Sequence, residues 1–196
     1  MTASSSSFRQ AEARRRRIAV WGVTGAGKST LARELGHRLG LPVIELDAIR
    51  HTPDWDSTPW PTFRSELLRR LDEAPEGWVL DGSYARAQDL YLHRIDTMIW
   101  LPLPLRVTLP RLFRRALQRS FAPHGAYGPG TARETLRRTF ASRESLLLYA
   151  LLTHRSVTRR RAARVAGLPD GVEVVELRSP LQVAAFLDHL SLEPPT

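Results

Sequence analysis

The sequence contains no cysteine, a single lysine and no long apolar run. The absence of cysteine excludes disulfides, thiolate zinc sites, iron–sulfur clusters and cysteine nucleophiles, and it fits a reducing compartment. No apolar run approaches the roughly 20 residues that a membrane-spanning helix requires. The N-terminus also lacks the apolar segment of a signal peptide. We therefore expect a cytoplasmic protein with no membrane partner.

Lysine is almost entirely replaced by arginine, with 28 Arg against one Lys in 196 residues. The one lysine is Lys28. An ammonium is a compact point charge that the planar guanidinium of arginine does not reproduce. The position of this lysine therefore points to a function that arginine cannot supply.

The composition is that of a folded protein, with 42% hydrophobic and 25% charged residues. Residues 1–17 are polar and Arg-rich and predict a disordered tail, and residues 18–193 predict a single domain. The net charge of +9 is concentrated in residues 106–164, which contain fourteen Arg and two Glu. A basic block beside a nearly neutral body indicates an anionic partner such as a nucleotide, a nucleic acid or a membrane surface.

Short apolar runs alternate with segments of helical periodicity along the chain. This alternation predicts an α/β fold with a parallel sheet covered by helices on both faces. We expect strands at 18–23, 42–46, 78–80, 96–101 and 172–177, and helices at 28–39, 62–71, 105–119, 131–152 and 181–190.

A glycine-rich phosphate loop follows the first predicted strand. The segment from Gly22 to Ser29 fits G-x-x-x-x-G-K-[ST] and opens a predicted helix, which is the context that this motif requires. Backbone N–H groups and the helix N-terminus would hold phosphates, Lys28 would reach the β- and γ-phosphates, and Ser29 would ligate Mg²⁺. The expected nucleotide-binding residues are Gly22, Thr24, Gly25, Ala26, Gly27, Lys28, Ser29 and Thr30.

Two acids are expected at the carboxyl ends of strands, where parallel α/β sheets bind their ligands. Asp81 follows Trp78–Leu80 and is predicted to hold the metal together with Ser29. Asp47 closes the second predicted strand, beside the phosphate loop. It would bind metal, accept a proton from an acceptor hydroxyl, or hold the acceptor.

The series of phosphate loop, ELDAIRHTPDW, WVLDGSY, RIDTMIWLPLP and an arginine-rich helix resembles the adenylate-kinase-related P-loop family. Within it, the sequence is most similar to the branch labelled DNA topology modulation protein. The resemblance covers about residues 18–154. It implies a three-layer P-loop kinase fold with five parallel strands in the order 2-3-1-4-5, an acceptor region at about 49–75 and a lid at about 115–138.

The resemblance also implies roles for individual residues. Asp81 matches the aspartate of the Asp-Gly-aromatic motif of nucleoside monophosphate kinases. Arg111, Arg114 and Arg115 fall where such kinases place ATP-facing and lid arginines. Residues 81–86 depart from the adenylate kinase motif because they lack its proline and shift its arginine by one position.

Several basic and aromatic residues have more than one interpretation. Arg50 and Arg86 are candidate ligands of an acceptor phosphate. Arg133, Arg137 and Arg138 follow a Gly/Pro-rich loop and belong to a closing lid or to a solvated basic face. Arg159–Arg161 and Arg164 indicate a basic surface or non-specific nucleic-acid binding. Trp55 and Trp60 would stack on a substrate ring or cover the core.

The leading hypothesis is a Mg²⁺-dependent phosphotransferase of the nucleoside monophosphate kinase-like type, which moves the γ-phosphate of ATP to a nucleotide or a small hydroxylated acceptor. Its expected catalytic residues are Lys28, Asp81, Asp47 and Arg115. The first alternative is a nucleic-acid-associated ATPase that uses the basic 106–164 block. The second is a nucleotide-binding regulatory module without turnover. The sequence leaves open the acceptor, the choice between ATP and GTP, and whether the protein is a monomer or a homodimer.

Overall fold

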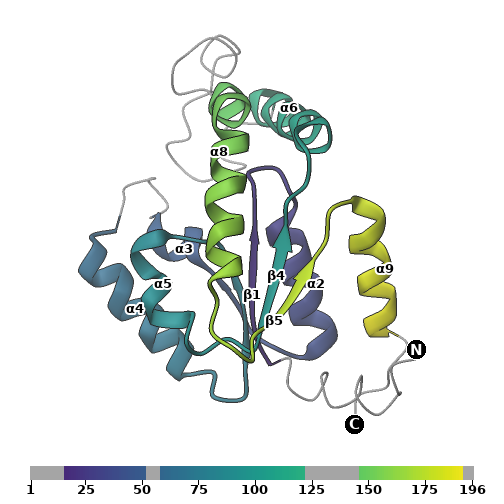
Figure 1. Cartoon of the computed structure of the whole chain (residues 1–196). Helices are drawn as coiled ribbons and strands as arrows, with labels where there is room; N and C mark the ends of the chain where they lie inside the picture. Colours follow the sequence, from purple (N-terminus) through teal and green to yellow (C-terminus); the bar gives the residue numbers. More distant parts are fainter. Residues whose placement is uncertain (1–15, 52–57, 122–145, 192–196) are drawn as a thin grey trace.

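The protein is a three-layer α/β structure built on a five-stranded parallel sheet (Figure 1). In this computed structural model we describe residues 16–51, 58–121 and 146–191. The strands lie in the order β2-β3-β1-β4-β5, which confirms the predicted fold and strand order. Their bounds are β1 Arg17–Gly22, β2 Val43–Glu45, β3 Trp78–Asp81, β4 Thr97–Leu101 and β5 Glu173–Glu176.

Strand β1 lies at the centre of the sheet because both of its edges are paired. Its residues Ile18 and Val20 lie opposite Val79 and Asp81 of β3, while Ile18 also pairs with Thr97 of β4. All of its residues after Arg17 are buried, as expected for a strand covered on both faces. The carboxyl ends of β1 and β3 therefore meet at one edge, where the phosphate loop begins.

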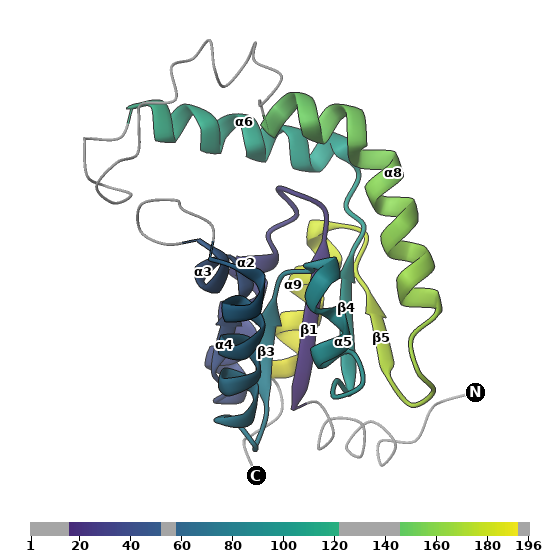
Figure 2. The ribbon, with the colours of Figure 1, turned by 90° about the vertical axis from the view of Figure 1, so that its left-hand side faces the viewer.

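Helices cover both faces of the sheet (Figures 1 and 2). One face carries α2 and α9, and the other carries α4, α5 and the C-terminal half of α8. Helices α3 and α6 lie near the carboxyl edge of the sheet, with α6 beside the N-terminal half of α8. The helix bounds are α2 Lys28–Leu39, α3 Leu46–Arg50, α4 Trp60–Asp72, α5 Gln88–Tyr91, α6 Leu105–Phe121, α8 Leu146–Ala166 and α9 Pro180–Ser191, and one 3-10 turn, η1, covers Ala85–Ala87.

Each face of the sheet has its own hydrophobic core. The core under α4 and α5 contains Phe63, Leu67 and Tyr91, all fully buried. The core under α2 and α9 contains Leu31 and Leu35, with partly buried side chains of α9 packed against it. Because the two cores pack against opposite faces of the same strands, the sheet is rigid at its carboxyl edge. The loops that leave this edge therefore start from fixed positions.

Two elements differ from the sequence predictions. The second strand ends at Glu45, and Leu46–Arg50 forms the short helix α3. Asp47 therefore lies in the first turn of a helix, where a negative charge is favourable, and the expectation that it closes a strand is wrong. Helix α8 continues to Ala166, well beyond the predicted end at residue 152. Its last turns are rich in Ala and Arg, which favour helix without adding an apolar stripe.

Two residues of the expected tail, Arg16 and Arg17, lie among the described residues and contact the fold. Arg17 is the first residue of β1, and the backbone N–H groups of Arg16 and Arg17 both donate to Asp96 Oδ2, at 3.0 and 2.9 Å. The rest of the predicted tail lies outside the described residues. So do most of the expected lid at 115–138 and the predicted helix at 131–145.

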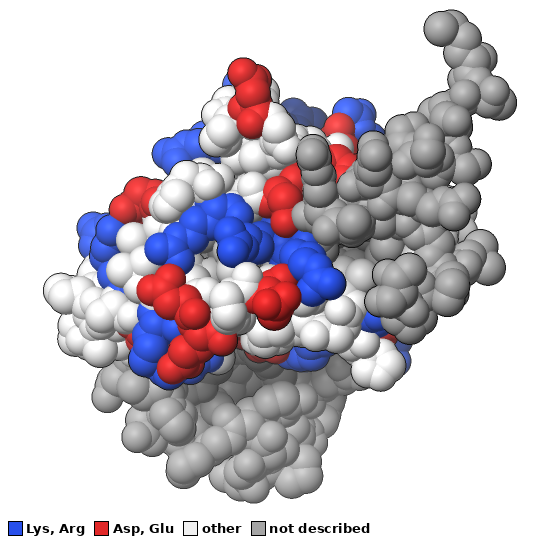
Figure 3. Space-filling view, turned by 90° about the horizontal axis from the view of Figure 1, so that it is seen from below, with Lys and Arg blue, Asp and Glu red and all other residues white. Residues whose placement is uncertain are grey.

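The end of the molecule remote from the phosphate loop carries charges of both signs (Figure 3). Basic side chains there are interspersed with acidic ones on the part of the surface that the structure describes. In α4, Arg69 pairs with Glu66 and Glu73, and Arg94 pairs with Asp72. Among the described residues, none of the helices is long and apolar enough to cross a membrane.

Candidate active site

The loop between β1 and α2 has the conformation that its glycines permit. Gly25 and Gly27 have φ angles of +78° and +89°, which side chains other than glycine rarely adopt. The N–H of Ala26 donates to the carbonyl of Val23 at 3.2 Å and closes the turn. Gly27 precedes α2, and no side chain caps this helix. The first N–H groups of α2 therefore suit an anion.

Lys28 is held inside this loop. Its Nζ donates to the carbonyl of Val23 at 3.1 Å. Burial and the nearby Arg161 lower the pKa of Lys28 to about 8, against the opposing effects of Asp81 and Asp47. The carboxylates around this ammonium come from β3 and α3, and a cation comes from α8. These segments therefore meet beside the loop that follows β1.

Asp81 is the last residue of β3 and is only 8% exposed. Burial raises the pKa of Asp81, and the nearby Ser29 hydroxyl and Lys28 ammonium oppose this shift. Its Oδ1 atom is buried and has no hydrogen-bond partner among the described residues. A hydroxyl beside an unpartnered carboxylate oxygen is a donor set that suits Mg²⁺. Asp81 and Ser29 thus lie close together, and their role as metal ligands stays a prediction.

The described residues contain no cluster of three His, Cys, Asp or Glu side chains that would hold a metal on its own. This arrangement fits Mg²⁺, which is commonly bound by one or two protein oxygens together with substrate phosphates and water. It does not fit a structural zinc site, because zinc needs a closed set of four protein ligands there.

Arg161 is a site residue that sequence reasoning assigned to a remote basic surface. Its guanidinium donates to the carbonyl of Gly22, at the start of the phosphate loop. Two further contacts attach α8 at this edge: His154 Nε2 lies 3.0 Å from the carbonyl of Leu103, and Arg164 donates to the side chain of Gln88. Extending the helical register past residue 152 would have predicted that Arg161 and His154 lie on one face, two turns apart.

A cavity of about 490 Å³ lies beside the loop, between α6 and α9. Gly25, Ala26, Gly27 and Thr30 form one wall, and Arg111 and Arg115 of α6 form part of another. Arg111 also donates to the carbonyl of Ala26 at 3.2 Å. Arg114 is exposed and lines no part of this cavity, and it has no hydrogen bond within the described chain. Two of the three expected α6 arginines thus reach the loop.

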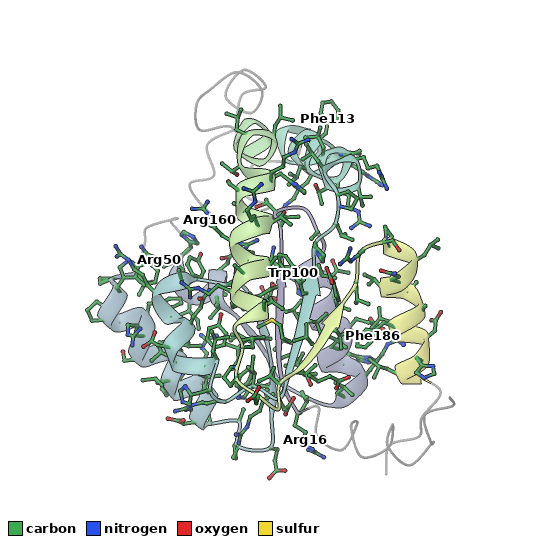
Figure 4. All side chains as sticks on the ribbon, in the orientation of Figure 1. Arg16, Arg50, Trp100, Phe113, Arg160 and Phe186 are labelled. Atoms are coloured by element: carbon green, nitrogen blue, oxygen red, sulfur yellow. The ribbon has the colours of Figure 1, made fainter. Side chains whose placement is uncertain are left out.

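A second group of side chains lies around α3 and the N-terminus of α4. The hydroxyl of Tyr84 donates to Asp47 Oδ1 at 2.7 Å. The ring of Tyr84 contacts the edge of Trp60, with centroids 6.0 Å apart. The guanidinium carbons of Arg50 and Arg86 lie 4.6 and 5.2 Å from the Trp60 ring centroid. Figure 4 shows Arg50 on the side of the molecule where α3 and α4 lie.

This arrangement brings Asp47, Arg50 and Arg86 together around Tyr84 and Trp60, and their role toward an acceptor stays a prediction. It also adds Tyr84, which sequence reasoning left without a role. A tyrosine three residues after a strand-end aspartate gives no motif by itself, since its partner Asp47 lies 37 positions earlier. Only the pairing of β2 with β3 places them side by side. The other aromatic candidate, Trp55, lies outside the described residues, as do Arg133, Arg137 and Arg138.

Comparisons with known proteins support the fold alone. Neither the family models nor the curated proteins contain a match to this chain. Among solved structures, the crystal structure of shikimate kinase from Bacteroides thetaiotaomicron is similar, with a TM-score of 0.50 and 17% sequence identity. The similarity covers 90% of this chain and 97% of that one. At this identity the likeness establishes the P-loop kinase architecture and leaves the activity to be argued from the site.

Proposed function

We propose that this protein is a phosphotransferase that moves the γ-phosphate of ATP to a small-molecule acceptor in the presence of Mg²⁺. The observation that carries the proposal is the convergence of Lys28 and Asp81 on one phosphate loop. Lys28 lies within the turn of the loop, and Asp81 contributes an unpartnered buried oxygen beside Ser29. A P-loop kinase fold, seen also in a solved kinase structure, supports this interpretation.

In this proposal the loop from Gly22 to Thr30 binds the phosphates, with Lys28 toward the β- and γ-phosphates. The cavity between α6 and α9 takes the nucleoside, and Arg111 lies beside its phosphates. Arg115 and Arg161 face Lys28 closely enough to lower its pKa. These guanidinium groups stabilise negative charge that spreads over the transferred phosphoryl group.

Ser29 and Asp81 would hold the Mg²⁺ ion. When bound, the ion neutralises charge on the β- and γ-phosphate oxygens. The protein residues meanwhile orient the reactants. The buried position of Asp81 keeps its carboxylate at the end of β3, and the Ser29 hydroxyl lies close to it.

The acceptor side distinguishes this proposal from its alternatives. A regulatory nucleotide-binding module has no need of a second set of polar side chains facing the phosphate loop. Asp47 and Tyr84 form such a set, and they favour transfer to an acceptor over nucleotide binding alone. We also propose that the chain belongs to the topology-modulation branch of the family and that the protein is cytoplasmic. In this proposal residues 49–75 bind the acceptor and residues 115–138 form a lid.

A nucleic-acid-associated ATPase is the second candidate, favoured by the charge of residues 106–164. Three of the arginines in this block, Arg111, Arg161 and Arg164, donate hydrogen bonds to groups within the fold. Nucleic-acid stimulation of ATP hydrolysis with a steep salt dependence would support this candidate. A phosphotransferase gives no such stimulation.

The test follows labelled γ-phosphate from ATP with Mg²⁺ across nucleotides, nucleosides and small alcohols. We expect label on an acceptor and the loss of transfer in Lys28→Ala, with Arg159→Gln as a matched surface control. Arg159 is exposed and has no hydrogen bond or ion pair within the described chain. Transfer that survives in Lys28→Ala would remove the assignment.

A further inference from the structure

Helix α5 contacts two elements that reach the phosphate loop. It has only four residues, and its first and last residues, Gln88 and Tyr91, are both buried. Positions three apart lie on one face of a helix. The two side chains nevertheless contact different elements, so α5 joins parts of the chain that are distant in sequence.

The last residue of α5 holds strand β1. Trp21 Nε1 donates to Tyr91 Oη at 3.2 Å, and both side chains are fully buried. Trp21 directly precedes Gly22, which opens the phosphate loop. A hydrogen bond inside a closely packed core leaves its two partners little freedom to move. The end of β1 at Gly22 is therefore fixed relative to α5.

The first residue of α5 holds helix α8. The guanidinium of Arg164 donates to the side-chain oxygen of Gln88. Gln88 is 7% exposed, so little of its surface is open to competing water. Burial raises the pKa of Tyr91, and the cations of Arg161 and Arg164 oppose this shift, so both arginines approach the Tyr91 hydroxyl. The C-terminal half of α8 is thus attached to α5, on the face of the sheet that both helices cover (Figures 1 and 2).

The contact between Arg161 and the phosphate loop depends on where α8 lies. Arg161 is on α8, about one turn before Arg164, and donates to the carbonyl of Gly22. One end of this contact is carried by α8 and the other by β1, and α5 is bonded to both elements. Hydrogen bonds weaken steeply as their geometry departs from the optimum. A small shift of α8 would therefore be enough to take Arg161 away from the loop.

We propose that Gln88 and Tyr91 are positioning residues, which hold Arg161 at the phosphate loop by fixing α8 and β1 to one short helix. This inference rests on the proposed function, because it needs an ATP site at the loop, and it names what sets the geometry of that site. Neither side chain touches the nucleotide. When the Gln88 contact is lost, α8 shifts, and Arg161 interacts less with the phosphates that Lys28 binds.

The first experiment measures ATP affinity by titration, which needs neither an acceptor nor turnover. Gln88→Leu replaces the amide by an apolar group of similar size and is expected to weaken ATP binding at least about threefold. Gln88→Glu keeps an oxygen that accepts from Arg164 and is expected to bind ATP as the parent protein does. Arg164→Gln removes the same contact from an exposed residue and should match Gln88→Leu, even if the buried substitution does not fold. Arg159→Gln, which also removes one charge from α8, is the control.

Double variants test whether Gln88 and Tyr91 act through Arg161. Arg161→Gln is expected to weaken ATP binding about tenfold, and Tyr91→Phe, which cannot accept from Trp21, at least about threefold. Once Arg161 is removed, Gln88→Leu or Tyr91→Phe should cause no further loss of affinity. Additive losses, or an unchanged ATP affinity in either single variant, would show that α5 does not position Arg161. Urea denaturation is the second readout, because a loss of stability persists in the Arg161→Gln background, whereas the loss of affinity does not.

The parent protein separates the two levels of argument. If it does not bind ATP, the proposed function fails. If it binds ATP, and both Gln88→Leu and Arg164→Gln bind ATP equally tightly, only the positioning proposal fails. In the label-transfer assay, Gln88→Leu should lower kcat in the parent protein but not in the Arg161→Gln background, and Gln88→Glu should keep the parent value.

Discussion

Gly25→Ala tests whether the phosphate loop is held by contact with α6. Gly25 has a φ angle of +78°. A Cβ atom there would lie 2.8 Å from Leu112 Cγ and 3.0 Å from the carbonyl oxygen of Thr108. Leu112 is 5% exposed and Thr108 is fully buried, so α6 has little room to yield. The substitution therefore adds a steric conflict to an unfavourable backbone conformation.

The expected cost has two parts that a second variant separates. A left-handed backbone conformation costs a non-glycine residue about 1–2 kcal/mol, and an extra methyl group in a packed site costs about 1–3 kcal/mol. Gly25→Ala should thus lower the free energy of unfolding by about 2–5 kcal/mol. Gly40 has a φ angle of +64°, and a Cβ atom there would have no neighbour within 4 Å, so Gly40→Ala should cost only about 1–2 kcal/mol.

Urea denaturation of the two variants and the parent protein gives these free energies, and titration with ATP gives the affinity. We expect Gly25→Ala to lose more stability than Gly40→Ala and to bind ATP more weakly, because the loop or α6 must move. Gly40→Ala should keep its ATP affinity. Equal stability losses in the two variants would show that α6 does not restrain the loop.

Three further outcomes are expected. Trp21 Nε1 donates to Tyr91 Oη at 3.2 Å between two fully buried side chains, so Tyr91→Phe should cost about 1–3 kcal/mol in urea denaturation; a neutral effect would contradict this. Under the proposed function, Arg161→Gln should lower kcat at least about tenfold in the label-transfer assay, since it removes a cation that lies at the phosphate loop near Lys28, whereas Arg159→Gln should not. Burial and Arg161 lower the pKa of Lys28 to about 8. Because the ammonium attracts phosphate and the neutral amine does not, ATP affinity measured by titration should fall as the pH rises above 8, and a flat profile in that range would refute this role.

The sequence was sufficient to predict the sheet and the phosphate loop. Buried parallel strands appear as apolar runs, and the glycines, Lys28 and Ser29 are contiguous, so motif and context can be checked together. Asp81 was predictable for the same reason, because it directly follows a buried strand and such ends face the ligand. The strand order required the family resemblance, since periodicity does not reveal which strands are neighbours.

Residues whose partners are distant in the chain were harder to predict. The Tyr84 contact with Asp47 depends on strand pairing and on α3, a five-residue helix that gives no periodic signal. Arg161 was overlooked because its segment is charged on every side, so the pattern did not distinguish the one arginine that reaches the loop. Arg50 and Arg86 were named separately, and only the structure joins them through Trp60.

The charge of the arginine-rich block of residues 106–164 is interpreted differently from the structure than from the sequence. Arg111 contacts Ala26, Arg161 contacts Gly22, and Arg164 contacts Gln88, so described arginines from two helices direct charge inward at the carboxyl edge of the sheet. The carboxylates of Asp81, at the end of β3, and Asp47, in the first turn of α3, act on the same Lys28 ammonium. In the proposed function, these arginines would attract the polyphosphate of ATP, while the carboxylates beside Lys28 would hold the metal and the acceptor.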